Sequence, residues 1–371
     1  MKKNHYIELG NPPGIQMDFS IDHYCKINAK KTDKSLLECI GDSLSDKQDI
    51  HLCLSGGLDS QFTLMYCLEL NKNITAYTYR SIWKDTILNV EDVYLAEQLA
   101  KKYNFEHHVI DIDLKKFYDT LQHYKYGADY LNSSPQLSVH FYFIELLKEK
   151  FNIDHILLGG DPPIMKYDEN IKIDKNKLVM RGERFYQDIM APYYIFCESI
   201  GVECLRDVYY HSPEAVYKSF ENNLDVIKKQ KIYADGNQRG TYLNDIYEYK
   251  YHYYKNIIPN LVPQRSETTG FESLKKILAQ ESGIYNQYDH LYRFPQTILN
   301  SESIKSRIQH HTMVKKEKLY NPTFKLLDLH ETKHINRNIR YSVEAQEIYK
   351  EFITYIRENN LKSINKYSFD F

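Results

Sequence analysis

The chain alternates short apolar runs with segments whose apolar residues recur at helical spacing. Four runs of β-branched, aromatic and other apolar residues predict strands, at 50–54, 74–80, 107–112 and 155–158. Between them, the segments 62–70, 91–103 and 136–148 place their apolar residues on one helical face. Strands that alternate with helices predict an α/β fold with a parallel sheet covered on both faces.

Residues beyond Asp161 have a mostly helical pattern that prolines interrupt. We therefore expect an N-terminal extension over 1–34, an α/β domain over 35–165 and a mainly helical substrate-binding region over 166–371. A chain of 371 residues and 44.2 kDa has room for this plan. Six tyrosines gather in one probable helix, and three of them, Tyr247, Tyr251 and Tyr254, share a face. Such a stripe is usually a packing surface, and a substrate-stacking wall is the alternative.

Composition narrows the function classes. The formal net charge is -2, which argues against a large nucleic-acid footprint but permits a free nucleotide. No apolar stretch is long enough for a spanning helix and no signal-peptide pattern follows Met1, so we expect no membrane contact and a cytoplasmic location. The six cysteines show no zinc-ligand spacing and no disulfide framework.

The chemistry-bearing segment is Ser55-Gly56-Gly57-Leu58-Asp59-Ser60, between the first strand and the first helix. Adjacent glycines let the backbone approach an anion, the serines add donors, and the helix N-terminus supplies free N–H groups. Asp59 suits such a cradle if a divalent cation lies between it and the phosphate, because Mg²⁺ is held by one or two carboxylates plus phosphate oxygens. The alternative is an ordinary strand-to-helix turn with Asp59 favoured by the helix dipole.

This hexapeptide resembles the PP-loop signature SGGxDS of the ATP pyrophosphatase superfamily. The resemblance extends through Glu91-Asp92, His107-His108, Ser133-Ser134-Pro135 and the turn Gly159-Gly160-Asp161 to the synthetase domain of asparagine synthetase and its relatives. It implies a HUP-like PP-loop nucleotide-binding domain with a helical C-terminal appendage. Where the family has GEGxDE, this chain has Gly159-Gly160-Asp161-Pro162-Pro163, so one acid remains.

The resemblance implies ATP and Mg²⁺ as cofactors and a reaction that adenylates an oxygen and releases pyrophosphate. It implies that residues 55–60, Gly159 and Gly160 hold the phosphates, that Asp59 and Asp161 hold the metal, and that backbone groups near Thr78 and Arg80 hold the adenine. Arg80 could instead meet a phosphate. The family's helical region supplies a lysine for the α-phosphate, and Lys255 is our choice, with an exposed lysine on a helix as the alternative. His107 and His108 are expected to have packing or hydrogen-bonding roles.

We therefore expect an asparagine synthetase-like, AMP-forming ligase that acts on a small-molecule substrate. Glutamine-dependent relatives carry a cysteine directly after the initiator methionine, and this chain has Lys2 there, so we expect a separate ammonia or amine donor. Three alternatives stay open: a nucleotide- or tRNA-modifying PP-loop enzyme, a sulfur transferase, and an ATP-binding sensor without catalysis.

Overall fold

The structure is a computed structural model of the whole chain. It describes residues 6–8, 16–17, 30–120, 135–160, 191–206, 208–230 and 243–258, together with Gln122, Tyr126 and isolated residues between 302 and 313. All structural statements below concern these residues.

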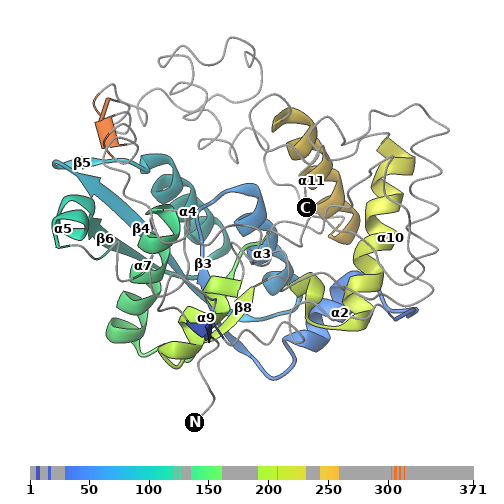
Figure 1. Cartoon of the computed structure of the whole chain (residues 1–371). Helices are drawn as coiled ribbons and strands as arrows, with labels where there is room; N and C mark the ends of the chain where they lie inside the picture. The colour runs from blue at the N-terminus through green and yellow to red at the C-terminus, as the bar shows by residue number, and fades with distance from the viewer. Residues whose placement is uncertain are drawn as a thin grey trace.

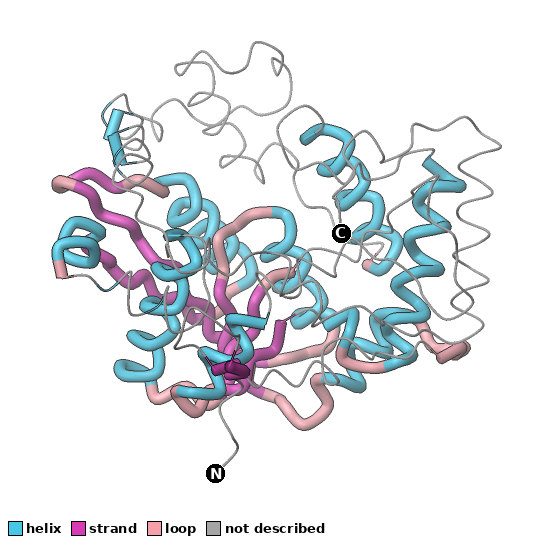
Figure 2. The backbone as a smooth tube through the Cα atoms, in the orientation of Figure 1, coloured by secondary structure: helices cyan, strands magenta, loops and turns pink. Residues whose placement is uncertain are grey.

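A mainly parallel sheet forms the centre of the described protein (Figures 1 and 2). Its parallel strands are β3 (Asp49–Cys53), β4 (Asn73–Trp83), β6 (Glu106–Asp113), β7 (His155–Leu158) and β8 (Glu203–Arg206). Strand β3 pairs with β4 and β7, β4 also pairs with β6, and β7 pairs with β8. The short strand β5 (Thr86–Ile87) folds back antiparallel on the end of β4. The predicted parallel α/β fold is therefore confirmed.

Two further strands lie in the N-terminal extension, where β1 (Tyr6–Glu8) pairs antiparallel with β2 (Gln16–Met17). The helices are α2 (Leu36–Ser43), α3 (Leu58–Glu69), α4 (Val90–Tyr103), α5 (Leu114–Asp119), α7 (Pro135–Phe151), α9 (Ala191–Ser199), α10 (Pro213–Gln230) and α11 (Leu243–Ile257), with a 3₁₀ turn η2 (Val208–Tyr210). Strand β8 joins the sheet from the region that the sequence pattern assigned to the helical appendage. The sheet thus draws on residues on both sides of the predicted boundary at 165.

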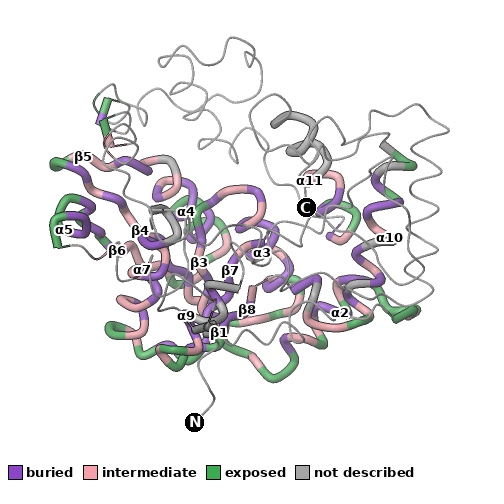
Figure 3. Tube along the Cα trace, viewed as in Figure 1, coloured by how far each residue is buried: buried purple, intermediate pink, exposed green. Residues whose placement is uncertain are grey.

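The core lies in two layers, one on each face of the sheet. Figure 3 shows the buried residues along the central strands and the helices beside them. One layer packs α2, α3, α4, α10 and α11 against the strands, and the other packs α5, α7 and α9. All four residues of β7 are buried, and they alternate between the layers: Ile156 and Leu158 face one and Leu157 the other. A strand buried on both faces reads as a continuous apolar run, which explains why the sequence pattern identified it.

The strand pairing brings two glycine turns to one edge of the sheet. Leu52 of β3 lies beside Leu157 of β7, and the strands are parallel, so the chain leaves both at neighbouring points of the carboxyl edge. Open α/β sheets bind their ligands at this edge. Both turns that the sequence singled out begin here.

Among the described helices, none has the length and apolar character needed to cross a membrane.

Candidate active site

The loop after β3 has the form of an anion cradle. Gly56 takes a left-handed conformation with φ +73°, and Gly57, with φ -67°, precedes the first turn of α3. No side chain of the described residues caps that turn, so its N–H groups and the positive end of the helix dipole face the loop. The hydroxyls of Ser55 and Ser60 lie 3.2 Å apart, which puts both donors on the same side of the loop.

The conformation of the loop depends on Gly56 in particular. A Cβ atom at this position would lie 2.3 Å from the Cβ of Leu95 in α4, and the positive φ already disfavours a side chain. The buried side chain of Gln61 in α3 donates to the Gly56 carbonyl at 2.6 Å and so fixes the turn. At Gly57, by contrast, the nearest atom to an added Cβ is Ser55 Oγ at 3.4 Å.

Gly56→Ala is therefore expected to lower the free energy of unfolding by about 2 to 4 kcal/mol, because backbone strain and a clash with α4 add. Gly57→Ala is the matched control, and its cost should stay below about 1 kcal/mol. Urea denaturation of the two variants measures the difference. Equal losses would contradict the view that the loop is packed against α4 at Gly56.

The second glycine turn meets the first at the start of α3. A Cβ atom at Gly159 would lie 3.1 Å from both the Cα and the N atom of Ser60. The Gly160 carbonyl lies 3.5 Å from the hydroxyl of Tyr254 in α11. Gly159 and Gly160 therefore lie at the same place as Asp59 and Ser60. Asp161, predicted as a metal and catalytic residue, lies outside the described residues.

Helix α11 supplies two polar groups to Asp59. Lys250 Nζ forms an ion pair with Asp59 Oδ2 at 2.8 Å, and the Tyr254 hydroxyl donates to Oδ1. The side chains of Lys250 and Asp59 are 14% and 33% exposed, so the pair is shielded but reachable. One acid, one lysine and the N-terminus of a helix thus meet between the two glycine turns.

Lys255, the lysine predicted for the α-phosphate, lies elsewhere on α11. It is exposed, and its Nζ lies 5.7 Å from the centre of the Tyr251 ring. Its role at a phosphate stays a prediction, whereas the lysine that the structure brings to the loop is Lys250. The sequence pattern did not single out Lys250 as the phosphate lysine, and it gave Tyr254 a packing or substrate-stacking role with no contact to the loop. The signal was their spacing, because residues four apart share one helix face.

The side chains of Thr78 and Arg80, the two residues predicted near the adenine, form hydrogen bonds and an ion pair within the protein. The Thr78 hydroxyl is buried, donates to the Leu54 carbonyl and lies 2.8 Å from His107 Nε2. Arg80 forms a two-pronged ion pair with Asp111, with N–O distances of 2.6 and 2.8 Å. This pair raises the pKa of Arg80 and lowers that of Asp111. Asp111 holds Nε and Nη2 of Arg80, so Nη1 is the group that a phosphate could meet without breaking this pair. The adenine contacts predicted near Thr78 and Arg80 stay a prediction.

His107 is half-buried beside Thr78, and its desolvation together with His108 lowers its pKa to about 4. The imidazole is therefore neutral near pH 7 and serves as a hydrogen-bonding partner, in line with the structural role expected for it.

The two cysteines near the loop, Cys67, which is buried, and Cys53, which is partly buried, are both protonated. Burial raises the pKa of the Cys53 and Cys67 thiols well above the usual range, because the thiolate would lose its hydration. A buried thiol held neutral is a poor sulfur carrier. These two cysteines therefore give no support to a sulfur-transfer reaction at this site.

The described residues fit a Mg²⁺ ion that arrives with a nucleotide. No three His, Cys, Asp or Glu side chains in the described part of the chain are placed to hold a metal by themselves. Asp59 supplies a carboxylate beside the anion cradle, and Mg²⁺ is commonly bound through one or two carboxylates plus substrate phosphates.

Fold and loop together define this part of the chain as an α/β domain whose glycine loop leads into a helix N-terminus at the carboxyl edge of the sheet. Residues 31–161 match the family model described as asparagine synthase, which covers about a third of the chain. No curated protein sequence matches the chain.

Three solved structures show low similarity to the chain. A predicted subunit of tRNA methyltransferase from Methanocaldococcus jannaschii is 20% identical over 43% of this chain and 68% of its own, with a TM-score of 0.25. The NH3-dependent NAD synthetase from Campylobacter jejuni is 13% identical over 75% and 92%, with a TM-score of 0.30. The U34-tRNA thiolase from Methanococcus maripaludis is 11% identical over 74% and 88%, also with a TM-score of 0.30.

Proposed function

We propose that this protein is an AMP-forming, ATP-dependent ligase. It adenylates a carboxylate or amide oxygen of a small molecule and then lets a nitrogen nucleophile displace AMP. The observation that carries the proposal is the meeting of Asp59, Lys250 and two glycine turns at the N-terminus of α3. The match of residues 31–161 to the asparagine synthase family supports the same reaction class.

The reaction has two steps. An oxygen of the substrate attacks the α-phosphorus of ATP, the bond from that phosphorus to the bridging oxygen breaks, and pyrophosphate leaves with the electron pair. A nitrogen then attacks the activated carbon, the bond to the AMP oxygen breaks, and the nitrogen loses a proton to solvent. No covalent link to the protein is needed.

The residues of the loop stabilise the charge that grows on the departing pyrophosphate. The N–H groups at the start of α3 and the hydroxyls of Ser55 and Ser60 donate to its oxygens, and the Lys250 ammonium adds a positive charge. These groups are set by the fold before ATP binds, so little reorganisation is required. Bound Mg²⁺, held by Asp59 and by Asp161 if that side chain reaches the site, would neutralise phosphate charge.

The partners we propose are a small-molecule substrate and a separate donor of ammonia or an amine, in the cytoplasm. A net charge of -2 argues against binding to a long nucleic acid through its phosphates, and a contact with a short RNA is the alternative. The substrate itself is set by the helical region beyond Asp161.

The test is to incubate the purified protein with ATP, Mg²⁺, a panel of carboxylates and ammonium, and to separate the nucleotides. We expect AMP and pyrophosphate in equal amounts, dependent on one of the carboxylates, and no glutamate release when glutamine replaces ammonium. Formation of ADP and phosphate would contradict the proposal. AMP formation that requires RNA and no carboxylate would favour the base-modifying alternative instead.

A further inference from the structure

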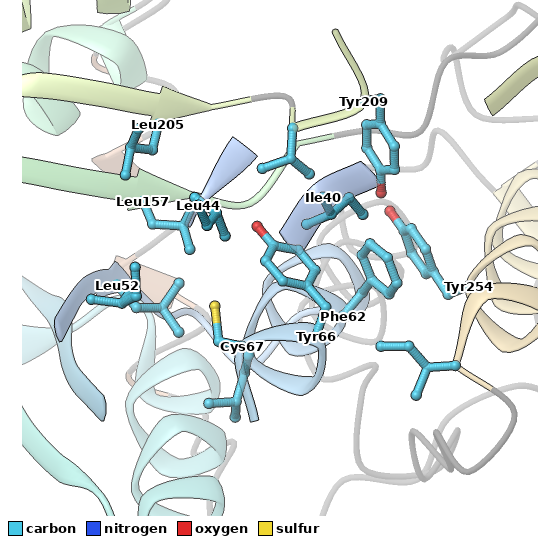
Figure 4. Packing of buried hydrophobic residues seen from close by; sticks show 14 of the residues in the cluster. Ile40, Leu44, Leu52, Phe62, Tyr66, Cys67, Leu157, Leu205, Tyr209 and Tyr254 are labelled. Carbon is cyan, nitrogen blue, oxygen red and sulfur yellow. The ribbon is translucent and has the colours of Figure 1, made fainter. Parts of the chain in front are cut away.

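The Tyr254 hydroxyl touches three segments that are far apart in the sequence. It donates to Asp59 Oδ1 in the loop, lies 3.5 Å from the Gly160 carbonyl in the second turn, and is hydrogen-bonded to Tyr209 of η2. Figure 4 shows the Tyr254 and Tyr209 hydroxyls pointing toward one another beside Phe62. No assigned role in the reaction accounts for this hydroxyl.

The ring of Tyr254 is held rigidly. It is fully buried and stacks on Phe62 of α3, with the ring centres 4.2 Å apart and the planes 12° from parallel. Phe62 lies three residues after Asp59 in α3, so the two side chains share a helix face. Phe62 in turn stacks on Tyr209 at 6.2 Å. The hydroxyl of Tyr254 therefore has a fixed place relative to the carboxylate.

The two oxygens of Asp59 have unlike partners. Oδ1 accepts from the rigid, buried Tyr254, whereas Oδ2 pairs with Lys250, whose ammonium sits on a flexible four-carbon stem. Both partners are on α11, four residues apart. Of the two oxygens, Oδ2 is the one whose partner can move away when a cation binds.

We propose that Tyr254 is a positioning residue: it holds Asp59 Oδ1 and so presents Oδ2 to the cation that accompanies ATP. The inference rests on the proposed function, because it assumes that Asp59 faces a nucleotide-bound cation. It also makes α11, which belongs to the C-terminal region, part of the nucleotide site. Displacement of α11 would release Tyr254 and Lys250 from Asp59 together.

Tyr254→Phe tests the proposal, because it removes the hydroxyl and keeps the stacked ring. Tyr253→Phe is the matched control: Tyr253 is equally buried on the same helix, and its ring packs edge-on against that of Tyr254, which the substitution preserves. Binding of the non-hydrolysable analogue α,β-methylene ATP is measured by calorimetry over a range of Mg²⁺ concentrations. Loss of one hydrogen bond to a charged group should raise the Mg²⁺ concentration for half-maximal binding about tenfold in Tyr254→Phe. Saturating Mg²⁺ should restore binding, and Tyr253→Phe should behave like the wild type.

A second variant tests the stacked ring, and the unfolding temperature of each variant checks its folding. Phe62→Leu keeps the hydroxyl and the acid but removes the stacked ring, and it should raise the Mg²⁺ requirement in the same direction by a smaller factor. If the wild type shows Mg²⁺-dependent binding and neither variant changes the Mg²⁺ requirement, Tyr254 only anchors α11 and this inference is wrong. If the wild type does not bind the analogue at all, the proposed function itself fails.

Discussion

Asp59→Asn is expected to abolish ATP turnover while leaving the protein folded. The substitution keeps the size of the side chain and its ability to accept from Tyr254, but it removes the charge that pairs with Lys250 and that would face a phosphate-bound cation. A group of this kind contributes several kcal/mol to stabilising a departing phosphate. We expect AMP formation to fall by about 1,000-fold, which corresponds to about 4 kcal/mol of transition-state stabilisation.

The measurement is the initial rate of pyrophosphate release, compared with the circular dichroism spectrum and the unfolding temperature of the variant. Asp119→Asn serves as the control, because it removes the acid of an exposed lysine pair, Lys115–Asp119 on α5. Exposed pairs of this type contribute little to stability. Undiminished AMP formation in Asp59→Asn would contradict the assignment of residues 55–60 as the nucleotide loop.

The elements that could be predicted are those whose burial requires a recognisable pattern of apolar residues along the sequence. Strand β7 was found because Ile156, Leu157 and Leu158 form an apolar run, and α3 and α4 were found because their apolar residues recur at helical spacing. Strand β8 was missed because Glu203 and Arg206 flank only two apolar residues, a pattern too short to distinguish from a turn. Strand β5 was missed because it has two residues and follows a turn in which Lys84 and Asp85 both have positive φ.

The polar contacts of the site were harder to predict, because they depend on the register between paired strands and on which face of each helix is turned toward the site. Arg80 meets Asp111 because β4 and β6 pair in a register that sets these two residues side by side. From the sequence, Arg80 was expected near the adenine or at a phosphate, and its ion pair with Asp111 was not expected. The tyrosine stripe was interpreted as a packing surface, and for Tyr254 this is correct, since it packs on Phe62. The contact of its hydroxyl with Asp59 depends on which face of α11 is turned toward the loop, and no local sequence pattern specifies that orientation.

The orientation of α11 also decides which of its two lysines, Lys250 or Lys255, faces the loop. Residues five apart on a helix differ by about 140° around its axis, so Lys250 and Lys255 point in different directions. Lys250 reaches Asp59, and Lys255 is exposed. An ammonium at the loop can stabilise the departing pyrophosphate, whereas the ammonium of Lys255 lies away from the loop. We therefore expect Lys250→Met to lower kcat/KM for ATP about 100-fold. Lys255→Met should stay within about threefold of the wild type, because surface substitutions away from a site change little.

Methionine suits both positions because it keeps an unbranched apolar stem and removes only the charge. Steady-state kinetics of AMP formation at varied ATP concentration measures both variants, with equal unfolding temperatures as the check on folding. A loss confined to Lys255→Met would favour the choice made from the sequence and reduce the contact between Lys250 and Asp59 to a structural ion pair. A loss confined to Lys250→Met would identify it as the lysine that acts on the phosphates, because the two variants differ in position alone and not in the chemistry removed.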